Sequence, residues 1–190
     1  MPPTTQLGWA IDLTRCTGCH ACTVACKSEN NTEPGAGLLQ LRNGRPVGVD
    51  YRRVLTRDAG TFPNVSRTFV TMSCNHCKEP ACLKSCPVGA ITKRASDGVV
   101  LIDQAACIGC KYCIWACPYG APQFNVATNK VEKCTLCVHR LDAGLQPACV
   151  TTCTGRALTL ETFDAARSGE GAPNGFAHPK YTTPSARFTR

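Results

Sequence analysis

The stretch that decides the fold is Cys107 to Cys117, which reads CIGCKYCIWAC and is followed by Pro118. Its four cysteines have the spacing CxxCxxCxxxCP. A CxxCxxC loop can wrap three irons of one [4Fe-4S] cube, and the fourth thiolate must come from elsewhere in the chain. In runs that end in CP the last cysteine binds a neighbouring cube, so that two blocks exchange their final ligands. The stretch therefore predicts paired iron–sulfur clusters.

The same pattern recurs along the chain in two alternating kinds of block. The first kind is found again from Cys16 to Cys26, which reads CTGCHACTVAC. The second kind opens with CxxC and closes with PACxxxC, once from Cys74 to Cys86 and once from Cys134 to Cys153. This alternating order indicates a duplicated unit with one block of each kind. The predicted cluster ligands are all sixteen cysteines: Cys16, Cys19, Cys22, Cys26, Cys74, Cys77, Cys82, Cys86, Cys107, Cys110, Cys113, Cys117, Cys134, Cys137, Cys149 and Cys153.

The high cysteine content also admits a disulfide framework or zinc sites. Residues Met1 to Trp9 lack the basic start and the apolar run of an export signal, which disfavours disulfides. Zinc is the main alternative, because two CxxC pairs can bind it through the same thiolates. Zinc explains neither the third cysteine of the CxxCxxC loops nor the trailing CP. Four-iron clusters are therefore preferred, and a three-iron centre at one site stays open.

Charge and hydropathy narrow the range of partners. The formal net charge of +8 counts every cysteine as neutral, whereas an oxidised cluster with four thiolates carries about −2. Four clusters bring the loaded protein near neutrality, and the basic residues lack the interleaved aromatics of a nucleic-acid surface. Gly98 to Asp103 (GVVLID) is typical of the longest apolar runs, far short of the roughly 20 residues that span a bilayer. We expect neither nucleic-acid binding nor a transmembrane segment in this chain.

The predicted fold class is α+β, with short strands and helices joined by long cysteine-rich loops. Alternating or β-branched stretches end shortly before the cysteine blocks, and Asp97-Gly98 and Thr128-Asn129 are typical of hairpin turns. The expected strands are Gly8–Asp12, Thr68–Met72, Val99–Asp103 and Lys130–Lys133, and the expected hairpins pair Ala90–Thr92 with Val99–Ile102 and Pro122–Asn125 with Lys130–Lys133.

Two cysteine-free segments fall outside the repeat. Residues 31–67 are expected to form an insertion, with a strand at Val49–Leu55 and turns at Glu33-Pro34-Gly35, Asn43-Gly44 and Asp58-Ala59-Gly60. Residues 166–190 are rich in Gly, Pro and Thr. We expect them to form an extended arm that either frays or docks on a partner.

Residues near the blocks are expected to support the clusters. Gly18 and Gly109 let the backbone approach sulfur closely. Apolar side chains keep water from the clusters, cations offset their charge, and the nearby histidines are surface or packing residues rather than ligands. The apolar shell is assigned to Val24, Leu83, Ile108, Ile114 and Trp115, the cations to Arg15, Lys27, Lys111 and Lys133, and the histidines are His20, His76 and His139.

Four longer motifs resemble those of a known family. They are ACKSENN at 25–31, CNHCKEPACLKSCPVGAI at 74–91, CIGCKYCIWACPYGAPQFN at 107–125 and KCTLCVHRLDAGLQPACVTTC at 133–153. From about Leu7 to Leu160 the chain resembles the four-cluster iron–sulfur subunit of molybdopterin oxidoreductases of the dimethyl sulfoxide reductase type. The resemblance implies two bacterial-ferredoxin-like modules in a pseudo-twofold relation, each with two [4Fe-4S] clusters.

The resemblance also implies which cysteines share a cluster, which spacing alone does not select. Blocks one and four form an outer module, residues 1–30 plus 126–165, and blocks two and three form an inner module, residues 68–125. The implied ligand sets are Cys16, Cys19, Cys22 and Cys153 for cluster 1; Cys134, Cys137, Cys149 and Cys26 for cluster 2; Cys74, Cys77, Cys82 and Cys117 for cluster 3; and Cys107, Cys110, Cys113 and Cys86 for cluster 4.

Position 110 bears on the number of irons in cluster 4. In the nitrate reductase relatives of this family one cysteine of the third block is tryptophan, and that cluster has three irons. Here the residue is Cys110. The resemblance therefore implies four irons at this site, as in the dimethyl sulfoxide, polysulfide and tetrathionate reductase branches.

The resemblance further implies a non-catalytic subunit that relays single electrons. Its expected partners are a catalytic subunit with molybdenum or tungsten bound to molybdopterin, and a quinone-reactive membrane subunit. Alternatives are a free-standing polyferredoxin and, more remotely, a zinc-bound structural module. We expect membrane association through partners, on the cytoplasmic face or, by co-export with a signal-bearing partner, on the periplasmic face. The substrate and the direction of electron flow are not encoded in this chain.

Overall fold

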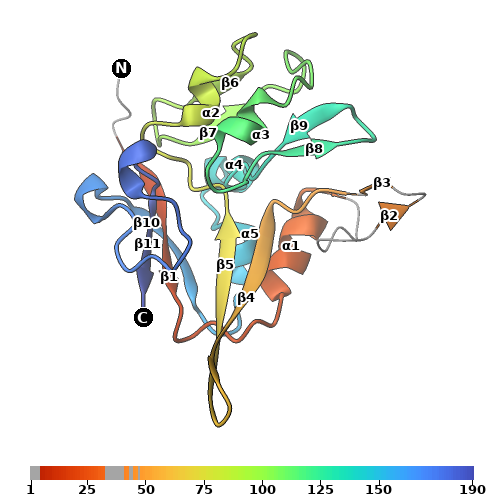
Figure 1. The fold of residues 1–190 in the computed structure, drawn as a ribbon. Helices are drawn as coiled ribbons and strands as arrows, with labels where there is room; N and C mark the ends of the chain where they lie inside the picture. The colour runs from red at the N-terminus through yellow and green to blue at the C-terminus, as the bar shows by residue number, and fades with distance from the viewer. Residues whose placement is uncertain (1–4, 33–40, 43–44, 47) are drawn as a thin grey trace.

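The computed structural model describes residues 5–32, 41–42, 45–46 and 48–190. Its elements gather at two ends of the molecule (Figure 1). We call residues 74–133 the inner region and the described residues on either side of them the outer region. The mixture of short strands and short helices agrees with the predicted α+β class.

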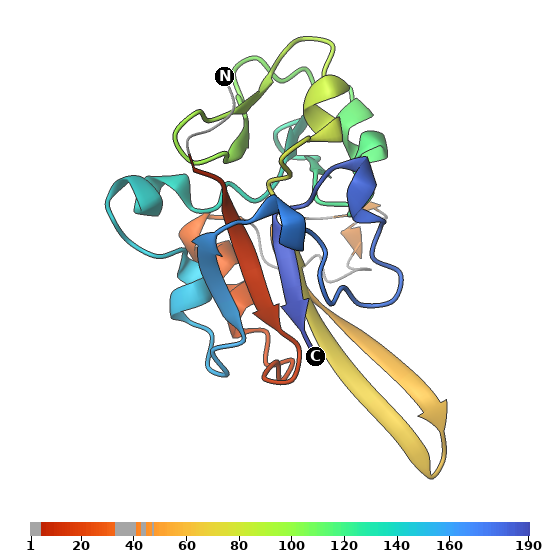
Figure 2. The same ribbon diagram turned by 90° about the vertical axis from the view of Figure 1, so that its left-hand side faces the viewer.

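The outer region is built on a three-stranded sheet that joins distant parts of the chain. Strand β1 (Leu7–Asp12) lies in the middle, antiparallel to β10 (Leu158–Thr162) and parallel to β11 (Ala186–Thr189). The three strands lie side by side in Figure 2. Trp9 and Ile11 on one face of β1 and Ala10 on the other are all buried, as expected for a central strand that is covered on both faces. The predicted strand at Gly8–Asp12 is thus confirmed.

The expectation of an extended arm at residues 166–190 is wrong. This segment passes through two short 3₁₀ helices, η1 (Ala165–Arg167) and η2 (Pro179–Tyr181), and ends in β11. Phe188 of β11 is only 4% exposed. The backbone groups along the second edge of β1 need partners, and β11 supplies them.

A long hairpin projects from the outer region (Figure 1, Figure 2). It pairs β4 (Arg52–Thr61) with β5 (Asn64–Ser73), so the strands expected near Val49–Leu55 and Thr68–Met72 are both present and longer than predicted. The turn predicted at Asp58-Ala59-Gly60 is wrong, because these residues lie inside β4. Asp58 instead pairs across the ribbon with Arg67 at 2.6 Å. Polar residues are expected on a two-stranded ribbon because both of its faces are exposed to solvent.

The insertion predicted at residues 31–67 has no structural boundary at position 67, because β5 continues through this position to the second cysteine block. Two short strands, β2 (Leu41–Arg42) and β3 (Arg45–Pro46), precede β4. The turns predicted at Glu33-Pro34-Gly35 and Asn43-Gly44 lie outside the described residues.

The inner region contains the two predicted hairpins. Strand β6 (Ile91–Lys93) pairs with β7 (Val100–Ile102), and β8 (Gln123–Asn125) pairs with β9 (Lys130–Glu132), both antiparallel. Both hairpin predictions are confirmed, with Gly98 and Asn129 in the left-handed backbone conformation that such turns require.

Among the described residues, five short helices follow or contain the cysteine blocks. Helix α1 (Ala21–Glu29) packs against α5 (Ala148–Thr151) in the outer region, and α2 (Ala81–Lys84) packs against α3 (Tyr112–Ala116) in the inner region. Helix α4 (Val138–Asp142) lies between the two ends of the molecule (Figure 1). In the part of the chain that the structure describes, no helix has the length and apolar character needed to cross a bilayer.

Candidate iron–sulfur sites

The first and third cysteine blocks fold into the same local backbone. In each block a glycine after the first cysteine has a positive φ, 72° at Gly18 and 70° at Gly109. A second left-handed residue, His20 or Lys111, then starts the helix. A side chain at Gly109 would collide with the carbonyl oxygen of Asn129. Glycine is therefore required there by conformation and by space, as the sequence predicted.

The second and fourth blocks also share a local backbone. His76 and Leu136 occupy the same place in their CxxC loops, and both have a positive φ. Pro80 and Pro147 then start α2 and α5, which carry the third cysteine of each block. Proline suits the start of a helix, where its missing N–H leaves no hydrogen bond unmade. The duplication inferred from the sequence is thus repeated in the conformation of the chain.

Three of the four implied ligand sets each line a separate cavity. All cysteines are free thiols, and each of these cavities has one whole set on its wall, with largely apolar surroundings. One cavity is lined by Cys74, Cys77, Cys82 and Cys117, a second by Cys86, Cys107, Cys110 and Cys113, and a third by Cys16, Cys19, Cys22 and Cys153.

The remaining set, implied for cluster 2, gathers where α1 packs against α5. Helix α1 carries Cys26 and α5 carries Cys149, while Cys134 and Cys137 lead into α4. Burial is the largest cause that raises the pKa of Cys26, and the nearby thiols of Cys149 and Cys137 raise it further. The thiols of this set are therefore close enough to affect one another. All four are buried. The set implied for cluster 2 is therefore brought together as well.

Burial makes these thiols poor anions unless a metal binds them. It is the main cause that raises the pKa of Cys26, Cys77 and Cys82 to about 12, and that of Cys113 to about 11. The thiols must lose these protons before iron can bind them as thiolates. Backbone N–H groups donate to cysteine sulfurs, among them Leu136 to Cys134 at 3.3 Å and Ala157 to Cys153 at 3.2 Å.

The donor chemistry fits cubane clusters. Four soft thiolates surround each cavity, which is the ligand set of a [4Fe-4S] cluster. Within the described residues no three His, Cys, Asp or Glu side chains are close enough together to hold a single metal ion. The fit to a polynuclear group rests on the cavities themselves.

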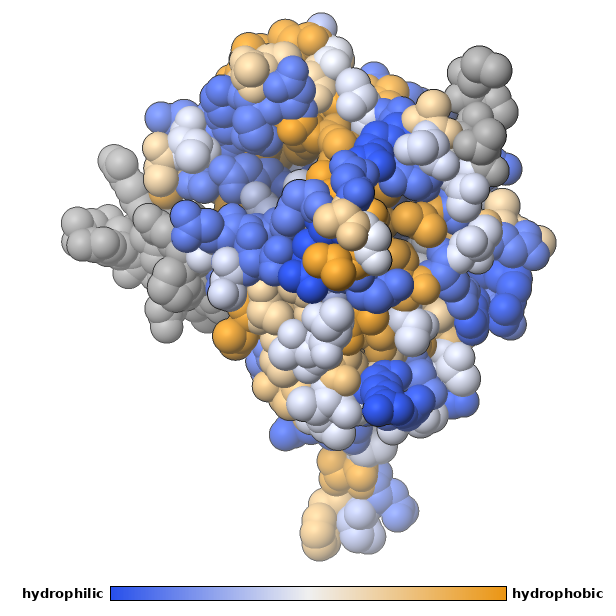
Figure 3. Space-filling model, turned by 180° about the vertical axis from the view of Figure 1, so that it is seen from behind, coloured by the Kyte–Doolittle hydropathy of each residue, from blue (hydrophilic) through white to orange (hydrophobic). Residues whose placement is uncertain are grey.

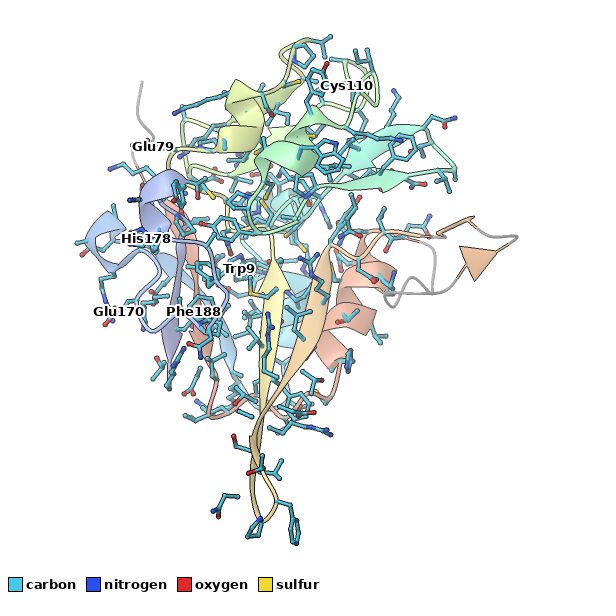
Figure 4. The ribbon with its side chains drawn as sticks, in the orientation of Figure 1. Trp9, Glu79, Cys110, Glu170, His178 and Phe188 are labelled. Atoms are coloured by element: carbon cyan, nitrogen blue, oxygen red, sulfur yellow. The ribbon has the colours of Figure 1, made fainter. Side chains whose placement is uncertain are left out.

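Shared packing links the four sets from the outer to the inner region. Cysteines of the sets implied for clusters 1, 2 and 3 lie in the larger cluster of buried side chains, and cysteines of the sets implied for clusters 3 and 4 lie in the smaller one. A thiol of a neighbouring set is also among the lesser causes, after burial, that raise the pKa of Cys26, Cys134 and Cys82. Cys110 lies at the far end of the inner region in Figure 4. The connecting pairs are Cys22 with Cys26, Cys74 with Cys134, and Cys113 with Cys82.

The prediction of an apolar shell is confirmed only in part. Leu83 and Ile114 pack against the small inner core. Ile108 lines the cavity of Cys86, Cys107, Cys110 and Cys113, although its side chain is 64% exposed. Val24 is 66% exposed and Trp115 87%, so their assignment to the shell is wrong. Both follow a cysteine by two positions on a short helix, and only one face of such a helix can meet the cluster.

The histidine interpretation agrees with the structure. His20 is exposed, and His139 pairs with Glu29 at the surface at 2.7 Å. His76 is buried, and its Nδ1 accepts a hydrogen bond from the Val100 N–H at 3.0 Å. Burial, followed by the charge of Lys133, lowers the pKa of His76 well below its ordinary value, which keeps the ring neutral.

Sequence reasoning missed a buried arginine, Arg52. Its neighbour Arg53 donates to the carbonyl oxygens of Tyr119 and Gly120 at the molecular surface, whereas Arg52 is 1% exposed. Two adjacent arginines in an apolar stretch indicate that one must face inward on a strand. That signal was present in the sequence, but the segment was interpreted as an insertion.

Together, the fold and the cysteine sets define a ferredoxin-like iron–sulfur protein. The comparisons with known proteins agree. A model described as "4Fe-4S dicluster domain" matches residues 65–163, and one described as "4Fe-4S binding domain" matches residues 16–30.

Several curated proteins are similar to most of the chain. One chain of the anaerobic dimethyl sulfoxide reductase of Escherichia coli is 40% identical over 98% of this chain and 86% of its own length. A subunit of the sulfite dehydrogenase of Allochromatium vinosum is 48% identical over 80% of this chain and 67% of its own length. A subunit of the tetrathionate reductase of Salmonella typhimurium is 43% identical over 83% of this chain and 58% of its own length.

The chain belongs to the iron–sulfur subunits of molybdopterin oxidoreductases of the dimethyl sulfoxide reductase type. It carries four [4Fe-4S] clusters and transfers electrons rather than transforming a substrate.

Proposed function

We propose that this chain relays single electrons along a row of four clusters, between a molybdopterin catalytic subunit and a quinone-reactive membrane subunit. The observation that carries the proposal is the gathering of the cysteines into four sets in a row, three of them around cavities. Each cluster alternates between its oxidised and one-electron-reduced states when bound. The chain's own contribution is to hold the sites in order, to limit water around them and to present the two ends of the row to partners.

The ligand sets that we propose are those implied by the family resemblance. Sets 1 to 4 are the ligand sets of clusters 1 to 4. Sets 1 and 2 belong to an outer module, residues 1–30 plus 126–165, and sets 3 and 4 to an inner module, residues 68–125. The shared backbone of alternate blocks supports a pseudo-twofold relation between the modules. The C-terminal segment is assigned to the outer module, because β11 completes its sheet.

Exposed apolar side chains support docking at the inner end of the row. Ile108 is 64% exposed, Tyr112 60% and Trp115 87%, and all lie in the third cysteine block. Large apolar and aromatic side chains that are exposed to solvent in an isolated subunit are typical of the centres of protein interfaces. Figure 3, which views the molecule from the opposite side, shows that apolar surface is also present on the back of this end. The relay therefore associates with a membrane through its partners, on a face that those partners determine.

The proposal is tested by counting metal and by removing ligands in matched pairs. The anaerobically purified chain is expected to hold about sixteen irons and sixteen acid-labile sulfides, with interacting EPR signals after dithionite reduction. Cys16→Ser and Cys153→Ser are expected to remove the same EPR signal, while Cys26→Ser removes a different one shared with Cys134→Ser. Each variant serves as the control for the others.

Different outcomes separate the alternatives. If Cys153→Ser and Cys134→Ser remove the same signal, the proposed pairing of blocks is wrong. Iron near zero with stoichiometric zinc supports a structural module instead. Full cluster content in a chain that purifies without any partner, from a host that expresses the whole complex, supports a free-standing polyferredoxin.

A further inference from the structure

Two cations are buried in the described part of the chain beside the cysteine sets. Arg52 is 1% exposed and Lys133 is 3% exposed. Neither forms an ion pair with a carboxylate among the described residues. A buried charge without a countercharge is strongly unfavourable. Something else of negative charge must therefore compensate for each of them.

Arg52 is held in place by neutral groups only. Its guanidinium carbon lies 4.4 Å from the centre of the Trp9 ring, and Trp9 is near the middle of the molecule (Figure 4). Its two terminal nitrogens donate to the hydroxyl oxygens of Thr71 at 3.0 Å and Ser73 at 2.8 Å on the neighbouring strand β5. Its Nε has no partner among the described residues. These contacts fix the position of the charge without neutralising it.

The negative charge that faces Arg52 comes from cysteines. Burial alone would lower the pKa of Arg52, but the thiolates of Cys149, Cys134, Cys22 and Cys26 reverse this, so the pKa is raised. Three of these four cysteines belong to set 2 and one, Cys22, belongs to set 1. Trp9, over which the guanidinium lies, packs in one cluster of buried side chains with Cys22 of set 1 and with Cys134 and Cys149 of set 2. The guanidinium therefore lies beside both outer sets.

Thr71 extends the contact to set 1. Its hydroxyl oxygen accepts a hydrogen bond from Arg52, and the same oxygen lies 3.6 Å from the Cys22 sulfur. Because the oxygen accepts from the cation, its own hydrogen is free to point at the thiolate. A hydroxyl polarised by a cation is a stronger donor. Arg52 thus acts on set 2 directly and on set 1 through Thr71.

We propose that Arg52 is a fixed positive charge that raises the reduction potentials of the two outer clusters, most strongly at cluster 2. This inference rests on the proposed function. Reduction adds one electron from the neighbouring redox partner, makes or breaks no bond and needs no proton. A permanent cation in a dry site stabilises that added charge. Arg52 therefore keeps the two outer clusters able to accept electrons.

Lys133 is the corresponding cation of the inner region. Its Nζ donates to the carbonyl oxygens of Val100 and Cys134, and it lines the cavity of set 3. Burial and the Cys74 thiolate raise the pKa of Cys82, and Lys133 opposes them. Lys133 is therefore expected to act at cluster 3, which gives a second variant whose effect falls at a different site.

The test is an EPR redox titration of the loaded chain within its complex. Arg52→Gln is expected to shift the reduction equilibrium of cluster 2 by about tenfold or more towards the oxidised form, equivalent to about 59 mV for one electron. The midpoint potential of cluster 1 is expected to shift less, and that of cluster 4 not at all. Lys133→Met is expected to lower the midpoint potential of cluster 3 instead.

Two variants serve as controls. Arg67→Gln makes the same change of charge on the same hairpin, at a side chain that is 61% exposed. It is expected to leave the midpoint potential of every cluster unchanged. Arg52→Lys keeps the charge and is expected to retain more than half of the potential difference. If Arg52→Gln loads four clusters and its midpoints match those of Arg67→Gln, the inference is overturned.

Thr71→Val provides a second test of the inference if the Arg52→Gln variant does not bind its four clusters. It preserves the size of the side chain and removes only the hydroxyl between Arg52 and Cys22. The expected result is a lower midpoint at cluster 1 alone, and an unchanged midpoint there overturns the inference. Failure of the unmodified chain to hold about sixteen irons would instead overturn the proposed function, so the two failures are distinguishable.

Discussion

The outer and inner regions carry the same alternating cysteine blocks, but they surround them with different amounts of protein. The larger core includes Trp9, Leu158 and Phe188 around the three-stranded sheet, and it also takes in Cys74, Val99 and Ala121 of the inner region. The smaller core lies in the inner region alone and consists of Ile91, Val100 and Val131 together with the two ligands Cys82 and Cys113. Apolar packing can hold the outer region together, whereas the inner region depends on its clusters as cross-links.

The surfaces of the two regions differ as well. The inner region exposes Ile108, Tyr112 and Trp115 beside the fourth cysteine set, while the apolar groups that the outer region exposes include Phe62 and Val65 at the tip of the long hairpin. The comparison indicates a division of work. The outer region provides a stable frame, and the inner region brings a cluster close to the surface that meets a partner.

Iron removal tests the first half of this comparison and has the largest expected effect. Anaerobic chelation is expected to make the amides of β6 to β9 exchange about 100-fold faster, and those of β1 and β10 less than about tenfold faster. Hydrogen–deuterium exchange with mass spectrometry measures both in one sample, and the loaded chain is the control. Equal loss of protection in the two regions would contradict the comparison.

Phe188→Ala tests the apolar frame of the outer region. Phe188 is 4% exposed and stacks edge-on with Phe176 at 5.2 Å. Its truncation is expected to cost about 3–5 kcal/mol and to lower the melting temperature by about 6–20 °C. The matched control is Phe62→Ala, at a side chain that is 91% exposed. Similar melting temperatures for the two variants would show that β11 adds no stability.

Trp115→Ala tests the partner surface of the inner region. We expect the affinity for the membrane partner to fall about 30-fold, since buried interface tryptophans contribute about 2 kcal/mol or more. Iron content and melting temperature are expected to stay unchanged, because the side chain is exposed in the isolated chain. Titration of the loaded chain against the purified partner measures the affinity. If Phe62→Ala weakens binding instead, the docking surface lies on the outer hairpin.

Glu161→Gln is expected to have the smallest effect. The hydrogen bonds from Arg187 hold the pKa of the Glu161 carboxyl below its ordinary value of 4.5. The pair therefore stabilises the fold above pH 4.5 and loses this contribution as the pH falls through the lowered pKa. The variant is expected to lower the melting temperature by at most about 4 °C near neutral pH.

The pH dependence provides the check on that prediction. The difference between Glu161→Gln and the unmodified chain is expected to stay constant down to about pH 5 and to shrink below it. Asp58→Asn, which breaks a fully exposed pair with Arg67, is expected to change nothing measurable. A difference that grows as the pH falls would contradict the sign of the Glu161 effect.

The sequence predicted the parts of the fold that depend on neighbouring residues. Ligand spacing, the glycines at 18 and 109 and the two inner hairpins are all set within about ten residues of chain. A cluster needs thiolates at short, fixed intervals, and a tight turn needs particular residues. Such features are visible in a single sequence.

The features that were missed depend on distant partners. Strand β11 is a four-residue stretch among Gly, Pro and Thr, and it becomes a strand only because β1 has a free edge nearly the whole chain length away. Trp115 looks like a core residue by type but lies on the outward face of a short helix. Burial of Arg52 likewise follows from tertiary packing that local patterns do not reveal.

The parallel pairing of β1 with β11 has a consequence for the order of events at the ribosome. Leu7–Asp12 is synthesised before residues 74–133, whereas its two neighbouring strands, Leu158–Thr162 and Ala186–Thr189, are synthesised after them. The inner hairpins can therefore form, and receive iron, before β1 has either of its neighbouring strands. Cluster assembly in the inner region can thus precede completion of the outer sheet.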